Sequence, residues 1–174
     1  MSKTLILYST TDGQTKRICE YIKKGLKNRT LIDVIELKNN MNIPVSTYDE
    51  IIIGASIRYG KHKKEVFDFI NKNKLILDKK NNAFFTVNVV ARKSGKNTPA
   101  TNPYMKKFLG TVDWKPNKLE VFSGRIDYPN YRFFDKQIIR LIMFLTKGPT
   151  NTSESYEFTD WSRIKMFADS LNYD

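Results

Sequence analysis

Cysteine, histidine and long apolar runs are scarce in this chain of 174 residues, and each shortage excludes a class of protein. The single cysteine, Cys19, can form neither an internal disulfide nor a cysteine-ligated cluster, and we predict no metal site. No run approaches the ~20 apolar residues that a membrane span requires. The chain opens directly on a β-rich run at residues 4–8, so we expect no signal peptide and a protein of the cytosolic side.

Acidic residues are the other shortage. The chain holds 18 Asp and Glu against 30 Lys and Arg, which gives a formal net charge of +12. Such an excess indicates an anionic partner: nucleic acid, anionic lipid or a small polyanionic ligand. A lysine-rich proteome is an alternative that needs no partner at all. Because no nucleic-acid-binding motif accompanies the charge, we expect no nucleic-acid partner.

Strand-like and helix-like segments alternate along most of the chain. We predict strands at residues 4–8, 31–37, 49–55, 83–90 and 119–124, and helices at residues 16–26, 63–72 and 103–109. The β-branched run at 49–55 is typical of a strand that is buried on both faces of a parallel sheet. The pattern predicts one α/β domain over residues 1–174, with a doubly wound five-stranded parallel sheet and helices on both faces.

A hydroxyl-rich stretch follows the first predicted strand and opens the first predicted helix. It consists of Ser9, Thr10, Thr11, Asp12, Gly13, Gln14 and Thr15. Free backbone N–H groups, the positive end of the helix dipole and several hydroxyls would all face one anion there. Gly13 has no Cβ to hold a ligand away. The stretch therefore predicts a phosphate site, with an ordinary capped turn as the structural alternative.

Two common nucleotide motifs are absent. The chain has no G-x-G-x-x-G, so a dinucleotide fingerprint is missing, and it lacks the lysine of an ATP-type phosphate loop. In parallel sheets, ligands bind outside the carboxyl ends of the strands, where the loops 9–15, 56–60 and 91–102 are expected to meet. The sequence predicts a single crevice for a mononucleotide with one terminal phosphate.

Four segments carry a resemblance to a known family: LILYSTTDGQT at residues 5–15, IGASIRYG at 53–60, NVVARK at 88–93 and TDW at 159–161. They resemble flavodoxin-like proteins, which bind FMN, and they are more closely similar to the menaquinone-dependent protoporphyrinogen oxidases of bacterial haem synthesis. The resemblance implies the strand order 2-1-3-4-5. It also implies an oxidoreductase that uses FMN to oxidise protoporphyrinogen IX to protoporphyrin IX, with menaquinone or ubiquinone as electron acceptor.

The same resemblance implies the cofactor contacts. FMN is expected to touch the 9–15 stretch and the two loops that flank its ring, at Ser56, Ile57, Arg58, Tyr59, Asn88, Val89, Val90 and Ala91. Tyr59 would cover one ring face, whereas residues 86–103 contain no aromatic side chain, so we expect the other face to stay open. Asp12 stands where flavodoxins commonly have a threonine. We expect its carboxylate to turn outward, where it either accepts hydrogen bonds from backbone N–H groups or pairs with Lys16 or Arg17.

Basic side chains near the crevice are candidates for binding the two propionates of the porphyrinogen, because arginine pairs with carboxylates in bidentate fashion. The candidates are Arg58, Arg92, Lys93, Arg125 and Arg132, each with a solvated loop charge as its alternative. His62, the only histidine, is either catalytic or a surface residue. We assign no catalytic residue. A basic flavodoxin that only shuttles electrons and an FMN-dependent quinone reductase are the alternative functions.

Residues from about 126 to 155 form an insertion that a minimal fold of this kind does not need. We expect residues 156–159 to resume the fifth strand after it. The insertion contains a helix that is apolar in nearly every direction, which is typical of a helix lying in a membrane interface. The predicted contacts with an anionic membrane surface are Phe133, Phe134, Ile138, Ile139, Ile142 and Leu145. This predicts peripheral attachment to the cytoplasmic face of the inner (cell) membrane, with a core helix or a contact within an oligomer as the alternatives.

Overall fold

A five-stranded parallel sheet forms the centre of the protein, which the computed structural model describes at residues 2–39 and 41–172. Its strands lie in the order β2-β1-β3-β4-β5, so the predicted fold class is confirmed. Their bounds are β1 (Ser2–Ser9), β2 (Arg29–Glu36), β3 (Glu50–Ser56), β4 (Asn81–Val87) and β5 (Lys118–Phe122). The chain places β2 on one side of β1 and then crosses to add β3 on the other side, so the carboxyl ends of β1 and β3 flank the topological switch point.

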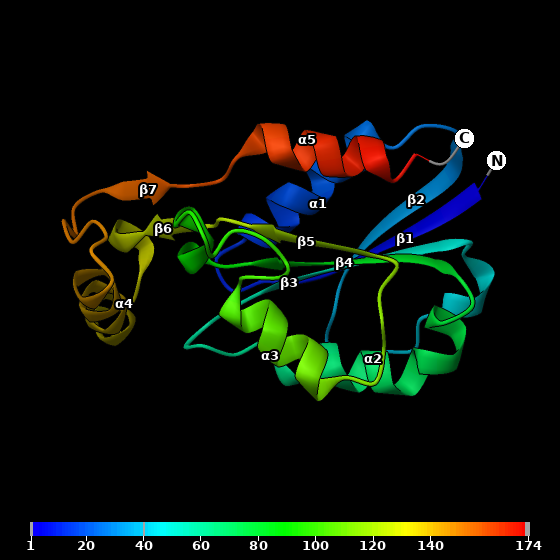
Figure 1. Ribbon diagram of the computed structural model, residues 1–174, viewed down its shortest axis with the longest axis horizontal. Coiled ribbons are helices and arrows are strands. Elements are labelled where there is room, and N and C mark those ends of the chain that lie inside the picture. The colour runs from blue at the N-terminus through cyan, green and yellow to red at the C-terminus, as the bar shows by residue number, and fades with distance from the viewer. Residues whose placement is uncertain (1, 40, 173–174) are drawn as a thin grey trace.

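Two helices cover each face of this sheet (Figure 1). Helices α1 (Gln14–Gly25) and α5 (Trp161–Ser170) lie on one face, and α2 (Lys64–Leu77) and α3 (Pro103–Thr111) lie on the other. The alternation of side chains along β1 explains the two layers: Leu5 and Leu7 belong to the core under α2 and α3, while Ile6 and Tyr8 belong to the core under α1 and α5.

Helix α2 runs to Leu77, beyond the end predicted at residue 72. Its last turn carries Leu77, which is fully buried. The polar residues at 71–74 precede Leu77 and interrupt the apolar pattern, so the sequence did not show that the helix continues. The amide of Asn82 then donates to the carbonyl oxygen of Leu77, at 2.8 Å, and closes the turn into β4. Burial of one side chain and a side-chain cap therefore decide where this helix ends.

The insertion builds a small unit of its own. Strands β6 (Arg125–Asp127) and β7 (Ser155–Glu157) pair antiparallel in a separate two-stranded sheet, and helix α4 (Phe133–Leu145) lies between them in the chain. The expectation that residues 156–159 resume the fifth strand is wrong. The returning chain is instead held at the end of β5, where the N–H of Phe158 donates to the carbonyl oxygen of Gly124.

This unit sits against the carboxyl ends of the main strands, where α4, β6 and β7 project from one end of the molecule (Figure 1). Its centre consists of the buried side chains of Ile126, Tyr128 and Met143, and Val89 from the loop after β4 packs against them. The guanidinium of Arg92 joins the same loop to the end of α4, since it donates to the carbonyl oxygens of Val89 and Thr146. The insertion is thus attached directly over the predicted ligand site.

Candidate functional site

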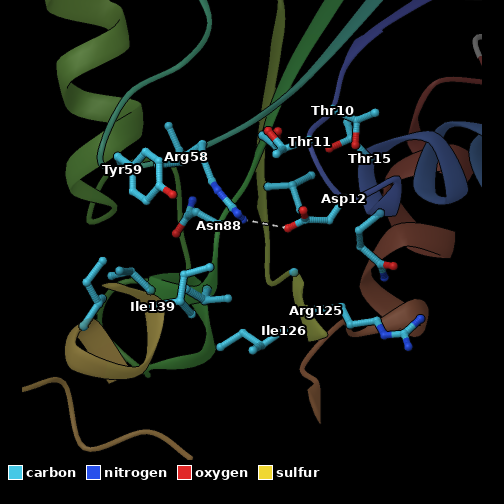
Figure 2. Close-up of a pocket in the computed structure, with 18 of the residues that line it drawn as sticks. Thr10, Thr11, Asp12, Thr15, Arg58, Tyr59, Asn88, Arg125, Ile126 and Ile139 are labelled. Carbon is cyan, nitrogen blue, oxygen red and sulfur yellow. Dashed lines mark hydrogen bonds and ion pairs between the residues drawn. The ribbon is translucent and has the colours of Figure 1, made fainter. Parts of the chain in front are cut away.

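A crevice of roughly 830 Å³, partly open to solvent, lies where the loops after β1, β3 and β4 meet (Figure 2). Twelve of the predicted cofactor residues line it: Thr10, Thr11, Asp12, Gln14, Thr15, Ser56, Ile57, Arg58, Tyr59, Asn88, Val89 and Val90. Ser9, Gly13 and Ala91 are not in the lining, although each adjoins a residue that is. The structure therefore brings the three predicted loops together in one place.

The first of these loops presents the uncapped start of helix α1. Gly13 is the residue before the helix and has a φ of 82°, a conformation that side chains disfavour. Its N–H donates to the Thr10 hydroxyl at 3.0 Å, and the first helical turn contains no acidic residue. A Cβ on Gly13 would meet nothing within 4 Å, so the space in front of the helix is open. The arrangement suits an anion.

Buried polar atoms around the crevice lack partners. Within the part of the chain that the structure describes, Ser9 Oγ, Thr15 Oγ1, Ser56 Oγ and Asn88 Nδ2 are buried and form no hydrogen bond. Folded proteins rarely leave such groups unpaired, because each unmet donor or acceptor costs free energy. The four atoms come from the ends of β1 and β3, the start of α1 and the loop after β4. They fit a ligand with a phosphate and a polar ring, as FMN has.

Asp12 finds a partner across the crevice. Arg58 donates to its Oδ2 at 3.0 Å (dashed line in Figure 2), and the Tyr131 hydroxyl donates to the same oxygen at 3.2 Å. The expected pairing with Lys16 or Arg17 is wrong, because Arg58 and Tyr131 hold Asp12 and the Arg17 guanidinium faces Gln14 and Glu157 instead. The second loop and the insertion, and not the first helix, compensate the charge of Asp12.

Arg58 has further contacts with the insertion. Its second amino group lies 3.5 Å from Asp135 Oδ2, at the start of α4. The guanidinium carbon lies 5.3 Å from the ring centre of Tyr59 and 5.0 Å from that of Tyr131. The Tyr59 hydroxyl also donates to Asp135. These contacts join the loop after β1, the loop after β3 and the insertion.

Sequence reasoning missed one wall of the crevice. That wall comes mainly from the insertion, through Ile126, Tyr131, Ile139, Ile142 and Met143, while Tyr104 lines the opposite part from α3. Aromatic side chains therefore reach the crevice from outside residues 86–103, where their absence had predicted an open ring face. The spacing of Ile139, Ile142 and Met143 is that of one helical face, but the apolar residues on the other faces of α4 concealed it.

The five predicted substrate-binding cations do not converge. Arg58 and Arg125 line the crevice, whereas Arg92, Lys93 and Arg132 do not. Arg125 pairs with Asp127 at 3.1 Å, and Arg92 donates to the carbonyl oxygens of Val89 and of Thr146. Their role toward a substrate stays a prediction.

The predicted membrane-contacting residues separate into two groups. Phe133, Phe134, Ile138 and Leu145 are exposed on the outside of α4, with 78% of Phe134 accessible. Ile139 and Ile142 line the crevice instead, although Ile142 is also partly exposed. Sequence analysis did not include the exposed Leu141 and Phe144. Across residues 2–39 and 41–172, none of the helices has the length and apolar character needed to cross a bilayer.

His62 is neither on the surface nor in the lining of the crevice. It is buried among phenylalanine rings, including those of Phe84 and Phe108, and its Nε2 lies 3.0 Å from Thr86 Oγ1. Burial, assisted by the positive charge of Lys107, lowers the pKa of His62 to about 4. A neutral core histidine is the result, so the expectation of a surface residue is wrong.

Comparison with known proteins agrees with this geometry. A family model described as a flavodoxin domain matches residues 5–153. A protoporphyrinogen IX dehydrogenase (quinone) of Escherichia coli (strain K12) is 41% identical over 167 residues, which cover 95% of this chain and 92% of the relative.

Two solved structures show the same fold. Oxidised flavodoxin 1 from Bacillus cereus is similar with a TM-score of 0.55 at 15% identity, over 98% of this chain and 97% of that one. A flavoprotein in complex with FMN from Lactobacillus acidophilus NCFM has a TM-score of 0.50 at 20% identity, over 70% and 93% of the two chains. The chain therefore belongs to the flavodoxin-domain family and, within it, to the group of the protoporphyrinogen IX dehydrogenases (quinone).

Proposed function

We propose that this protein is an FMN-dependent oxidoreductase that oxidises protoporphyrinogen IX to protoporphyrin IX and passes the electrons to menaquinone or ubiquinone. The observation that carries the proposal is the crevice itself, with its unpaired buried polar atoms beside the uncapped start of α1. Support for the substrate comes from the name of the Escherichia coli relative, which matches nearly the whole chain.

Each loop has a separate task in this proposal. The first turn of α1, with the hydroxyls of Ser9 and Thr15, holds the phosphate of FMN, because these groups are unpaired and face an anion-binding helix end. The loops that carry Ser56 and Asn88 hold the polar edge of the ring. Bound FMN would supply the two-electron chemistry, and the protein would supply binding and orientation.

The outer face of α4 is proposed to rest on an anionic bilayer. Phe133, Phe134, Leu141, Phe144 and Leu145 expose between 58% and 78% of their surface there. Lys136 and Arg140 lie on the same helix, and the chain as a whole carries a net charge of +12. Apolar side chains between cations are the recognition chemistry for an anionic lipid surface. The proposed location is therefore the cytoplasmic face of the cell membrane, in peripheral attachment.

One anaerobic experiment separates the enzyme from an electron shuttle. The FMN-loaded protein is mixed with protoporphyrinogen IX, and flavin absorbance is followed before and after addition of menaquinone or ubiquinone. We expect the porphyrinogen to bleach the flavin and the quinone to restore it. A flavin that responds to an external reductase but not to the porphyrinogen would indicate a basic flavodoxin. A flavin reduced by NAD(P)H alone would indicate a quinone reductase.

A further inference from the structure

A polar bridge crosses the crevice and connects three separate parts of the chain. We call Asp12, Arg58, Tyr59, Tyr131 and Asp135 the Arg58 bridge. Asp12 belongs to the loop after β1, which is proposed to hold the phosphate. Arg58 and Tyr59 follow β3, while Tyr131 and Asp135 belong to the insertion. Arg58 reaches Asp12 at 3.0 Å and Asp135 at 3.5 Å. One side chain therefore links the cofactor loop to the insertion.

Both terminal amino groups of the Arg58 guanidinium lie close to carboxylates of this chain. Its two amino groups face two different carboxylates, and the rings of Tyr59 and Tyr131 lie close to its carbon. Only 17% of the side chain is exposed. A planar fork can serve two carboxylates and two aromatic rings together, whereas the compact ammonium of lysine cannot. The geometry therefore points the two terminal amino groups of Arg58 at Asp12 and Asp135.

Tyr131 reinforces the bridge from the insertion side. Its hydroxyl accepts a hydrogen bond from the N–H of Asp127 at 3.1 Å and donates to Asp12 at 3.2 Å. Burial, with Asp12 as a further contributor, raises the pKa of Tyr131 to about 12, so the hydroxyl stays protonated and keeps donating at neutral pH. Tyr59 holds a φ of 50°, which is uncommon for a side chain of this size and needs support from its surroundings.

The bridge also resolves a charge problem. Asp12 sits one residue before Gly13, in the loop proposed to hold a phosphate. An uncompensated carboxylate there would repel the bound anion. Arg58 is the cation that the structure places on it, and Tyr131 adds a donated hydrogen bond.

We propose that Arg58 is a positioning residue that neutralises Asp12 in the phosphate loop and fastens the insertion over the crevice. The inference rests on the proposed FMN site and adds a coupling to it. The same side chain neutralises the carboxylate beside the phosphate and holds in place the insertion, which forms one wall of the crevice. Loss of Arg58 should therefore affect both the cofactor and the insertion.

FMN affinity tests the first half. Quenching of flavin fluorescence gives Kd for the parent, Arg58→Gln, Asp12→Asn and the double variant. We expect Arg58→Gln to weaken FMN binding by about tenfold, as for the loss of one charge-assisted contact. Adding Asp12→Asn should recover most of this loss, because the unpaired carboxylate is then gone. Because the double variant also lacks Arg58, its recovery would show that the chain folds without this side chain. A double variant as weak as Arg58→Gln alone would overturn the charge argument.

Hydrogen exchange of residues 126–155 tests the second half. We expect Arg58→Gln, Arg58→Lys and Asp135→Asn each to speed exchange in β6, β7 and α4. Lys64→Gln is the matched control, since it removes an exposed pair with Asp68 on α2 and should leave exchange unchanged. Parent-like exchange in all three variants would overturn the fastening role.

The outcomes also separate this inference from the proposed function. A parent chain that binds no FMN would contradict the cofactor site, while the exchange measurement would still decide whether Arg58 fastens the insertion. Normal FMN affinity and normal exchange in Arg58→Gln, together with a raised KM for protoporphyrinogen, would place Arg58 on the substrate and refute the positioning role.

Discussion

Gly13 shows how one residue sets the chemistry of the crevice. Its φ of 82° turns the chain from β1 into α1, and the space beside it is open. The helix begins there without a side-chain cap. Ser9 and Thr15 add buried hydroxyls that have no partner among the described residues. A small, conformationally free residue thus leaves room for the anion that these groups would bind.

Gly13→Asp should abolish FMN binding, because it places a carboxylate against the phosphate in addition to straining the backbone. Gly13→Ala is the matched control. Its Cβ meets nothing within 4 Å. Gly13→Ala should therefore lower the free energy of unfolding only by the cost of the left-handed conformation, roughly 1–2 kcal/mol. Flavin content after purification and the Kd for added FMN measure both effects. Equal flavin content in parent and folded Gly13→Asp would contradict the phosphate site.

His62 gives a prediction about pH. Its pKa is about 4 in the folded protein and 6.5 when unperturbed, so the unfolded chain takes up the proton first. The contribution of neutral His62 to the free energy of unfolding is therefore full above pH 6.5 and is lost as the pH falls toward 4. The loss between pH 7 and pH 5 is about 2 kcal/mol. His62→Gln should remove this part of the pH dependence. Urea unfolding of both proteins at the two pH values measures it, and identical pH dependence would refute it.

At the scale of an element, α4 carries two surfaces that have different uses. Ile139, Ile142 and Met143 point into the crevice, while Phe134 and Phe144 are among the side chains exposed outside. Mutations on the inner and outer faces of this helix should therefore have different effects. A variant at Ile139 or Ile142 disturbs the crevice and cannot by itself report on a membrane.

The triple variant Phe134→Ser, Leu141→Ser and Phe144→Ser tests the outer face. It should release the protein from anionic vesicles, since each side chain would lose up to ~1.5–3 kcal/mol of apolar burial. FMN affinity should stay at the parent value because none of the three lines the crevice. Vesicle co-sedimentation and flavin titration measure the two properties.

Ile139→Ser is the matched control on the inner face and should show the reverse pattern, with vesicle binding kept and FMN affinity lowered. Unchanged vesicle binding by the triple variant would exclude the outer face as the membrane contact. A change in sedimentation from oligomer to monomer in the triple variant would identify it as a contact between copies of the chain.

For the whole molecule, the insertion leaves and rejoins the domain at one point. β6 follows β5 after two residues, and the returning chain bonds to the same place through Phe158 and through the Thr159 hydroxyl, which donates to the carbonyl oxygen of Ser123. The five-stranded sheet takes no strand from the insertion. The domain should therefore fold without it.

Replacement of residues 128–154 by Asn-Gly tests this independence. Asp127 and Ser155 are paired across the small sheet, and a two-residue turn of this type suits such a hairpin. We expect a folded domain with a cooperative thermal transition, weaker FMN binding and no binding to anionic vesicles. Circular dichroism, flavin titration and co-sedimentation measure these. An unfolded product would show that the insertion is part of the folding unit.

The main sheet and its crevice could be predicted because their signals are local. An apolar run marks β1, a β-branched run marks β3, and the hydroxyl-rich stretch lies directly after β1. Strand and helix alternation then places the loop ends together. The loops that line the crevice, at residues 9–15, at residues 56–60 and after β4, were predicted in this way.

The rest depends on contacts between distant residues. Asp12 and Arg58 are 46 positions apart, and no local spacing identifies such a pair. Strands β6 and β7 have three residues each, too few for a recognisable period. Helix α4 is apolar on both its inner and outer faces, so its pattern could not show which residues line the crevice. His62 is buried by aromatic rings from other elements.

The two-sided character of α4 has a consequence for kinetics on the proposed function. With the proposed membrane contact, α4 alone would separate the crevice from the lipid. A quinone ring would then have only one helix to pass to reach the flavin, while its isoprenoid tail stays in the bilayer. Drawing that tail into water would cost about 0.8 kcal/mol per methylene group, which this route avoids. Turnover would then follow the mole fraction of quinone in the membrane plane, and diluting the surface with inert lipid would slow the reaction even at constant bulk concentration.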